Sequence, residues 1–340
     1  MPARFDREAV TTRVRIGPPV VSPVSGATVL PHMRMSQVPA DPDEPGGVYA
    51  TLRPLLISIA YEMVGAVGEA EDIVQEAFLR FHRAAAEGTD LQSPKAWLST
   101  VVTRLAIDHV RSARVRRETY VGTWLPEPLL TDSAPDAALY AETAEALSMA
   151  FLVLLERLSP VERAVFLLRD VFDFGFDEIA DIVGKSEDNC RQIAVRARRH
   201  IEAGKPRFEA SRERREALAR RFFEAVGAGS TDGLVDLLAA DVVLYTDGGG
   251  KGPAFPQPIC GRGPVTRVFA GYRPAALGAV EQRFAEVNGQ PGVVFMDAGA
   301  RAVAVIALDI AGGQIIAVRA ISNPEKLHHL DERPVRRGPD

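Results

Sequence analysis

The segment 159–201 constrains the fold of this chain most strongly, because it carries the start and stop signals of successive helices. Ser159, Pro160 and Glu162 form a helix start: a hydroxyl at the N-cap, a proline at the first helical position and a carboxylate three residues after the cap. The apolar residues that follow recur at intervals of three or four, which places them on one face of a helix: Val161, Ala164, Val165, Leu168 and Val171. The pattern predicts a helix that begins at Pro160 and packs on a core.

A short helix and then a basic helix are predicted next. The short helix covers 177–183 and ends at Gly184, a residue that leaves helical geometry easily, and Ser186 can cap the helix that follows. One face of the basic helix is small and apolar: Cys190, Ala194, Ala197 and Ile201. The opposite face carries amides and guanidinium groups, which suit base edges and phosphates in the major groove of DNA: Asn189, Arg191, Gln192, Arg196 and Arg199. A solvated basic helix is the alternative interpretation.

Composition narrows the class of protein. A length of 340 residues with 46% hydrophobic content allows two or three globular domains. The net charge is −5, so any nucleic-acid binding must come from local basic patches. Cys190 and Cys260 cannot form a disulfide framework, and a cytoplasmic location is expected. No apolar run approaches the roughly 18 residues that span a bilayer, and no signal-peptide segment is evident, so we expect no membrane partner.

Residues 1–47 are rich in proline, valine, serine and glycine without a sustained periodicity, which predicts a disordered tail. A gene model that truly starts at Met33 or Met35 is an alternative.

The pattern of residues 48–117 predicts a helical bundle, with apolar faces along 52–63 and 73–81 and a third helix that starts at Ser93 and Pro94. The far end of that third helix forms a basic surface suited to phosphates, with five arginines against one acid: Arg104, Arg111, Arg114, Arg116 and Arg117, with Asp108.

The runs 70–78 and 97–111 resemble region 2 of the extracytoplasmic-function sigma factors of the sigma-70 family, and 159–201 resembles region 4. The resemblance implies binding to core RNA polymerase and to promoter DNA, with region 2 at the −10 element and region 4 at the −35 element. It places Asp72, Gln75 and Glu76 on the polymerase-binding helix. It places Arg104, Asp108, Arg111 and the arginines that follow on the helix that faces the −10 element. Arg104 stands where many members of the family have asparagine.

The segment after this bundle is predicted to dock on another part of the molecule. Two prolines exclude a regular helix, and Trp124 and Leu125 are too apolar for a free linker. Packing of Trp124 on its own bundle is the alternative. The run Trp124, Leu125, Pro126, Glu127, Pro128 resembles a linker motif of one sigma-factor group whose members carry a SnoaL-like extension. The resemblance therefore implies a third domain.

Residues 212–330 have the pattern of an α+β domain. A helix through Leu218, Phe222 and Val226 precedes strand-like runs at 241–245, 281–287, 292–296, 302–309 and 314–321. Asn288 and Gly289, the run 297–299, and Gly312 with Gly313 are predicted turns. We expect a curved antiparallel sheet. The order resembles the SnoaL-like cone, which often encloses an apolar pocket and so leaves room for a small-molecule ligand as a partner.

Two motifs of this domain resemble marks of the same sigma-factor group: Asp247, Gly248, Gly249, Gly250, Lys251 and Asn323, Pro324, Glu325, Lys326, Leu327. Consecutive glycines permit close approach by a partner, so we interpret the first motif as a contact loop for the linker, in which Lys251 can pair with Glu127. A loop that cradles phosphate is a second interpretation, but the Walker spacing and the following Ser or Thr are lacking. A flexible turn is the third.

The predicted organisation is multidomain, with two all-α modules and a C-terminal α+β SnoaL-like cone. The expected parts are a disordered tail 1–47, a region 2 domain 48–117, a linker 118–145, a region 4 helix-turn-helix domain 146–208, a SnoaL-like regulatory domain 212–330 and a flexible tip 331–340. The predicted function is that of a sigma factor regulated in cis by its C-terminal domain. We predict no catalytic site, metal or cofactor.

The sequence leaves two alternative functions. A SnoaL-like isomerase or cyclase needs acid-base groups, for which Asp247, Asp297 and Asp309 are candidates. Only His328 and His329 among the histidines fall in that domain, after its last predicted strand, and no acid-base pair is evident. A ligand-responsive helix-turn-helix regulator accounts for 159–201 and for the cone, but it does not account for the region 2 module.

Overall fold

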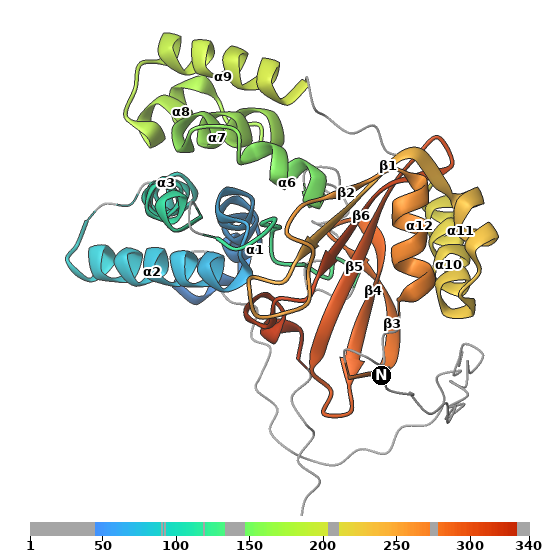
Figure 1. Ribbon diagram of the computed structural model, residues 1–340. Helices are drawn as coiled ribbons and strands as arrows, with labels where there is room; N and C mark the ends of the chain where they lie inside the picture. Colours follow the sequence, from blue (N-terminus) through green and yellow to red (C-terminus); the bar gives the residue numbers. More distant parts are fainter. Residues whose placement is uncertain are drawn as a thin grey trace, which may run out of the picture. The chain divides into compact units, whose positions relative to one another are not determined.

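The computed structural model describes residues 45–89, 91, 93–117, 120–132, 147–202, 211–272 and 278–331 (Figure 1). All of them belong to one compact unit, 41–340. The predicted disordered tail lies outside the described residues except for positions 45–47, and so does the predicted tip except for Asp331. Linker residues 118–119 and 133–146 also lie outside.

The first helical bundle contains α1 (Pro45–Val64), α2 (Val67–Ala86) and α3 (Pro94–Arg117). Its predicted apolar faces are confirmed, since they are buried or pack on the core: Leu52, Leu55, Leu56, Ile59 and Met63, then Ile73, Val74, Ala77, Phe78 and Phe81. The hydroxyl of Ser93 accepts a hydrogen bond of 3.3 Å from the amide of Ala96, as expected for the first turn of α3. Gly65 has a φ of 73° and ends α1 in the left-handed region.

The second helical module contains α6 (Met149–Leu155), α7 (Pro160–Phe166), the π-helical turn η1 (Leu167–Val171), α8 (Phe176–Val183) and α9 (Glu187–Glu202). The predicted start of α7 is confirmed, because Ser159 and Glu162 form a capping box. Gly184 ends α8 with a φ of 66°, and the predicted apolar face of α9 is buried. These signals are local in sequence, which explains why they could be predicted.

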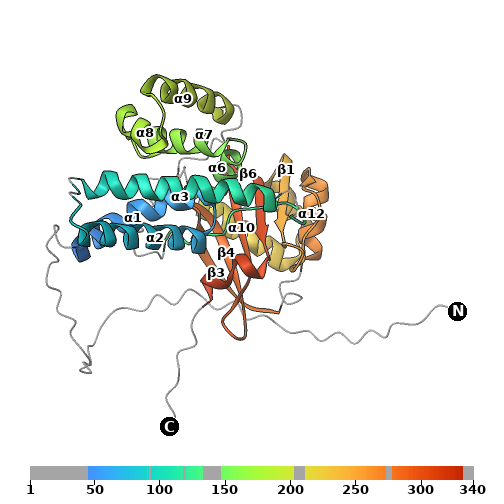
Figure 2. The ribbon, with the colours of Figure 1, turned by 90° about the vertical axis from the view of Figure 1, so that its left-hand side faces the viewer.

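The two helical modules share one continuous apolar core. Helix α3 contacts α1 and α2 of its own bundle, and it also contacts α7 and α8 of the second module. Figure 2 shows α3 between them. The modules are therefore packed together in this structure.

The C-terminal domain combines helices with a mixed sheet, which confirms the predicted α+β class. Its helices are α10 (Arg212–Ala228), α11 (Thr231–Leu237) and α12 (Arg262–Gly271), followed after the last strand by the short turns η3 (Pro324–Lys326) and η4 (His328–Leu330). Its strands are β1 (Leu238–Asp247), β2 (Ile259–Cys260), β3 (Ala279–Val287), β4 (Gln290–Asp297), β5 (Ala302–Ala311) and β6 (Gln314–Ile321). In the part of the chain that the structure describes, six strands form one sheet in the order β2-β1-β6-β5-β4-β3.

The predicted antiparallel pairing is confirmed for four of the strand pairs described, but it was wrong for β1 and β6, which pair in parallel. A parallel neighbour requires a long crossover, and the chain between β1 and β6 supplies it through α12 and the β3–β5 meander. Register shifts interrupt several of the pairs, including those at Phe295 and Asp309, and bulges of this kind bend a sheet.

Both faces of the sheet are covered. Helices α10, α11 and α12 lie on one face (Figure 1), and aromatic side chains from Phe222, Phe269 and Phe295 pack there. This is the arrangement expected of the SnoaL-like cone. The opposite face carries Val294, Val305 and Ile321, and it packs on residues from outside the domain, among them Leu125 of the linker and Met149 of α6. The second face therefore joins the domain to the rest of the chain.

Candidate functional site: the linker between the helical modules and the sheet

Asp247, at the end of β1, is the centre of a cluster that holds the linker. The residue is 1% exposed. The carboxylate accepts hydrogen bonds from the hydroxyl of Tyr120 at 2.5 Å, from the amide of Leu125 at 2.8 Å and from Nζ of Lys326 at 2.7 Å. Burial, and then the hydrogen bond to Asp247, raise the pKa of Tyr120, so its hydroxyl stays a donor. We call Tyr120, Trp124, Leu125, Asp247 and Lys326 the motif cluster.

Lys326 compensates the charge of Asp247 inside this cluster. The first turn of η3, capped by Asn323, presents Lys326, and the residue is 7% exposed. Its ammonium donates to Asp247 and to the carbonyl of Leu125, and it lies 4.5 Å from the ring centroid of Trp124. A buried ammonium is tolerated where it is paired and hydrogen-bonded, and the face of a tryptophan ring adds a cation–π attraction.

The other side of the linker contacts the first helical bundle. Trp124 lies against Gly65, where a methyl group would come within 2.9 Å of Cη2 of the indole. The amide of Glu127 donates to the carbonyl of Gly65 at 2.8 Å, and the carboxylate accepts from the amide of Val67 at 2.7 Å, in the first turn of α2. Burial raises the pKa of Glu127. Packing of Trp124 on its own bundle and contact with the C-terminal domain therefore occur together.

The glycine loop also lies at this junction. Gly249 has a φ of 58°, and any side chain there would collide with the amide of Asn323. Gly250 faces Val121 of the linker. The expected ion pair between Lys251 and Glu127 is absent from the described contacts. Lys251 pairs with Glu325 on the surface, whereas the carboxylate of Glu127 accepts from the amide of Val67 at the start of α2.

The remaining motif residues also lie along this junction. Leu327 is buried beside Leu125, and the carbonyl of Pro128 is 2.8 Å from Nε2 of His329. Pro126 lies near Gly65, and Pro324 occupies the first turn of η3. The structure thus places residues from both C-terminal motifs against the linker.

The residues expected to bind polymerase lie on α2. Asp72 and Gln75 are exposed, and Glu76 is partly exposed and pairs with Arg80 at 2.7 Å. Leu79, which is 47% exposed, continues the same stripe and was not predicted. An apolar residue four positions after Gln75 is the signal that could have revealed it.

The residues expected to read DNA on α9 are exposed: Asn189, Arg191, Gln192, Arg196 and Arg199. Arg191 is partly neutralised, because it pairs with Glu187 at 2.8 Å and with Asp188 at 3.4 Å. Arg196 is 4.0 Å from the carboxylate of Glu162. Val195, 44% exposed, lines a shallow hollow with Arg191, Gln192 and Arg196 and was missed because it is not polar.

Arg104, which was expected to face the −10 element, is exposed and contacts α8 in this structure. Its Nε donates to the carbonyl of Ile182 at 2.9 Å, and a terminal nitrogen donates to the carbonyl of Asp181 at 2.8 Å. These carbonyls lie at the C-terminal end of α8, where a cation is favoured. On the same helix Asp108 and Arg111 are exposed and pair at 3.1 Å. Arg114, Arg116 and Arg117 belong to α3, but their side chains lie outside the described residues.

The carboxylates considered for acid-base chemistry have other partners. Asp247 holds the linker, Asp297 pairs with Arg301 in a turn, and Asp309 pairs with Arg319 at 2.9 Å. Leu244 and Leu308 pack on the helix-covered face, and side chains alternate along a strand. Asp247, three residues after Leu244, and Asp309, one residue after Leu308, therefore point away from that face. All three carboxylates are thus engaged by other residues of the chain.

No helix among the residues of known position is both long and apolar enough to cross a bilayer.

Comparison with known proteins agrees with the sequence motifs. The family model for Sigma-70 region 2 matches residues 48–116, and the model for Sigma-70, region 4 matches 148–201.

Two curated relatives come from Mycobacterium tuberculosis. The chain is 39% identical over 290 residues to the ECF RNA polymerase sigma factor SigJ. The matched region covers 82% of this chain and 91% of SigJ. The chain is 33% identical over 284 residues to the probable ECF RNA polymerase sigma factor SigI, with 82% and 93% covered. The crystal structure of SigJ matches with a TM-score of 0.67 at 36% identity, over 83% of this chain and 97% of that one.

Proposed function

The chain belongs to the extracytoplasmic-function RNA polymerase sigma factors, and from this premise we propose that its C-terminal domain controls the two promoter-binding modules by holding the linker between them. As a sigma factor it directs promoter-specific initiation, and its partners are core RNA polymerase and promoter DNA. We assign the α2 stripe of Asp72, Gln75 and Glu76 to polymerase, α9 to the −35 element and the exposed end of α3 to the −10 element. The protein acts in the cytoplasm, where its polymerase works.

The observation that carries the proposal is the motif cluster. A buried Asp247–Lys326 pair binds both the amide and the carbonyl of Leu125, and the ammonium covers the ring of Trp124. The same linker residues contact Gly65 and Val67 of the first bundle. A change in the C-terminal domain would therefore reach the first promoter-binding module through a few well-defined contacts.

The packing of the two modules supports restraint as the direction of control. The −35 and −10 elements lie about 25 base pairs apart, or about 85 Å along B-DNA at 3.4 Å per step. Modules that share one core and contact each other through α3 and α8 cannot reach both elements at once. The sigma factor must open to engage a promoter, and a held linker opposes that opening.

A small-molecule ligand of the C-terminal domain is part of the same proposal. A pocket of about 230 Å³ is lined by residues of α10, by the hairpin of β3 and β4 and by Asp132 of the linker. A ligand at this place would contact the domain and the linker together.

Run-off transcription with purified core polymerase tests the proposal. Trp124→Ala and a deletion of 247–251 should change promoter activity in the same direction, and the closed packing favours an increase. The double change should add little, because both changes release the same contact. Fully additive effects, or wild-type activity in both variants, would refute control through this linker.

A further inference from the structure

The turn between β3 and β4 makes a second contact with the helical modules, apart from both C-terminal motifs. Asn288 has a φ of 52° and Gly289 a φ of 69°, and Val287 pairs with Gln290 across them. This is the geometry of a two-residue hairpin turn, in which asparagine tolerates the left-handed conformation. Such turns usually face solvent, yet Asn288 is fully buried, at 0% exposed. Its side chain therefore needs partners.

Those partners come from three other parts of the chain. Nδ2 of Asn288 donates to the hydroxyl of Tyr61 in α1 at 2.7 Å and to the carbonyl of Leu147, ahead of α6, at 3.0 Å. Oδ1 accepts from the amide of Leu129 in the linker at 3.0 Å, and the amide of Asn288 donates to the carbonyl of Leu129 at 2.7 Å. One amide side chain thus joins region 2, the linker and the start of region 4.

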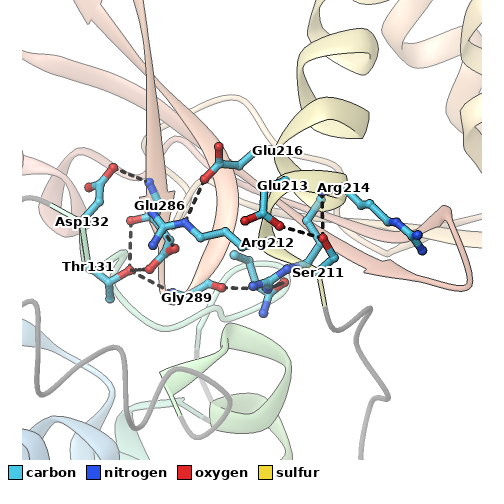
Figure 3. A network of polar contacts seen from close by, with 11 residues as sticks. Thr131, Asp132, Ser211, Arg212, Glu213, Arg214, Glu216, Glu286 and Gly289 are labelled. Carbon is cyan, nitrogen blue, oxygen red and sulfur yellow. Dashed lines mark hydrogen bonds and ion pairs between the residues drawn. The ribbon is translucent and has the colours of Figure 1, made fainter.

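The end of the linker adds a short strand beside the same turn. Leu130 bridges Val287 in antiparallel fashion, and the amide of Thr131 donates to the carbonyl of Glu286 at 2.9 Å. The hydroxyl of Thr131 accepts from the amide of Gly289 at 3.1 Å, and Asp132 accepts from the amide of Glu286 at 2.9 Å (Figure 3). Strand β3 is an edge of the sheet, and the linker covers part of that edge.

We propose that Asn288 is the positioning residue of a second interaction surface, through which the C-terminal domain holds region 2, the linker and region 4 together. The inference rests on the proposed function and adds a contact that the linker and C-terminal motifs do not include. Asparagine suits the position because it fits the left-handed turn and supplies a donor and an acceptor at once. Aspartate would lack the donors, and glycine would keep the turn but make none of the side-chain bonds.

The test is Asn288→Gly in the full chain, with Ala300→Gly as the control. Ala300 also has a left-handed φ, of 57°, in the turn between β4 and β5, so both changes put glycine into a glycine-compatible turn. Hydrogen exchange should become roughly ten-fold faster in 120–132 and 147–158 for Asn288→Gly, since loss of a buried hydrogen bond shifts a local opening equilibrium by about that factor. Peptides of β4 and β5 should keep wild-type rates, and Ala300→Gly should match wild type throughout.

Wild-type exchange in the linker would overturn the proposal, and so would faster exchange spread evenly over the sheet, which would make Asn288 a turn residue only. If Asn288→Gly fails to fold, Asn288→Asp tests the same bonds with a smaller change, because it keeps the acceptor and loses the two donors. Transcription separates this inference from the proposed function. Wild-type activity for Asn288→Gly alongside altered activity for Trp124→Ala would overturn the role of Asn288 alone. Wild-type activity for both would refute the proposed function, and the exchange rates would still decide whether Asn288 holds the modules.

Discussion

Lys326 and Glu62 are both buried ionisable residues, but their surroundings differ. Lys326 has a carboxylate, a carbonyl and an aromatic face around its ammonium. Glu62, in α1, is 1% exposed, and neither of its carboxylate oxygens has a hydrogen-bond partner among the described residues. The first charge is compensated and the second is best kept neutral, so the two residues lead to different predictions.

Lys326→Met should destabilise the protein by about 3–5 kcal/mol, because it leaves the buried carboxylate of Asp247 without its cation. Lys251→Met is the matched control in the neighbouring motif. Lys251 is 54% exposed and pairs with an exposed Glu325, so its loss should cost less than about 1 kcal/mol. Urea unfolding of both variants measures the difference. Equal losses would mean that the motif cluster does not depend on the buried pair.

Glu62 predicts a stability that falls as pH rises. Burial raises its pKa from the ordinary 4.5 to about 8, so the folded state binds the proton more tightly than the unfolded state does. The folded protein should therefore lose stability between about pH 4.5 and pH 8, by on the order of a few kcal/mol.

Glu62→Gln should remove that slope, with little change at pH 5 and a gain at pH 8. Glu71→Gln, at an exposed acid on α2, is the control and should leave the slope in place. Thermal melting across this pH range provides the measurement. A Glu62→Gln variant whose slope matches wild type would show that Glu62 titrates normally in the folded protein.

At the scale of elements, α9 carries an exposed polar stripe opposite its buried apolar face, and the arginines of the stripe differ in their contacts with acidic residues. Arg191 is paired with two acids of its own first turn, whereas Arg196 has a single carboxylate contact at 4.0 Å among the contacts described. Arg196 is therefore better placed to exchange its contact for one with DNA.

Arg196→Ala should weaken promoter binding by about 1–3 kcal/mol if the guanidinium makes a bidentate contact to a base. If Arg196 contacts only phosphate, binding should weaken alike for all sequences and the slope of binding against salt should become shallower. Affinities for specific and unrelated duplexes at several salt concentrations separate the two cases. Arg191→Ala, as the control, should have the smaller effect, and the reverse order would contradict this assignment.

Most helices and strands could be predicted because their signals are local. The capping box at Ser159, the stop at Gly184 and the apolar run along β5 are each visible within a few residues of sequence. Short elements were missed: β2 has two residues, and α12 begins amid Gly261 and Gly263, which hide its periodicity. The parallel pairing of β1 with β6 was also missed, because it depends on where a strand far along the chain returns.

At the scale of the whole molecule, the apolar side chains of Trp124 and Leu125 predicted that the linker packs on another part of the chain. The sequence did not identify every residue that it contacts. The pairing of Lys251 with Glu127 was a wrong expectation, since Glu127 is already engaged at the start of α2. From the sequence, Asn288 was predicted to lie in a turn, and Arg104 was predicted to face the −10 element. Neither prediction included the contacts that these side chains make with other parts of the chain. Their partners lie 227 and 77–78 residues away, so neither contact could be inferred before the modules were packed together.

The contact of Arg104 with α8 gives a last prediction, on the opening of the whole molecule. Arg104→Asn should weaken the packing of region 2 on region 4, since it removes the donors to the carbonyls of Asp181 and Ile182. The loss should be about 1 kcal/mol, because the side chain is largely exposed, and this corresponds to a several-fold larger open population. Energy transfer between dyes on α2 and α9, introduced through Glu71→Cys and Arg199→Cys in a Cys260→Ser background, would report the separation.

Arg111→Asn is the matched control, because Arg111 lies on the same helix and pairs with the exposed Asp108. It should leave energy transfer unchanged, whereas Arg104→Asn should lower it. A sigma factor that opens more easily should also need less polymerase to reach half-maximal run-off transcription, since fewer molecules must break the contact with α8 before binding. If Arg104→Asn instead lowers transcription while energy transfer stays at the wild-type value, then Arg104 acts on the −10 element and its contact with α8 does not hold the molecule closed.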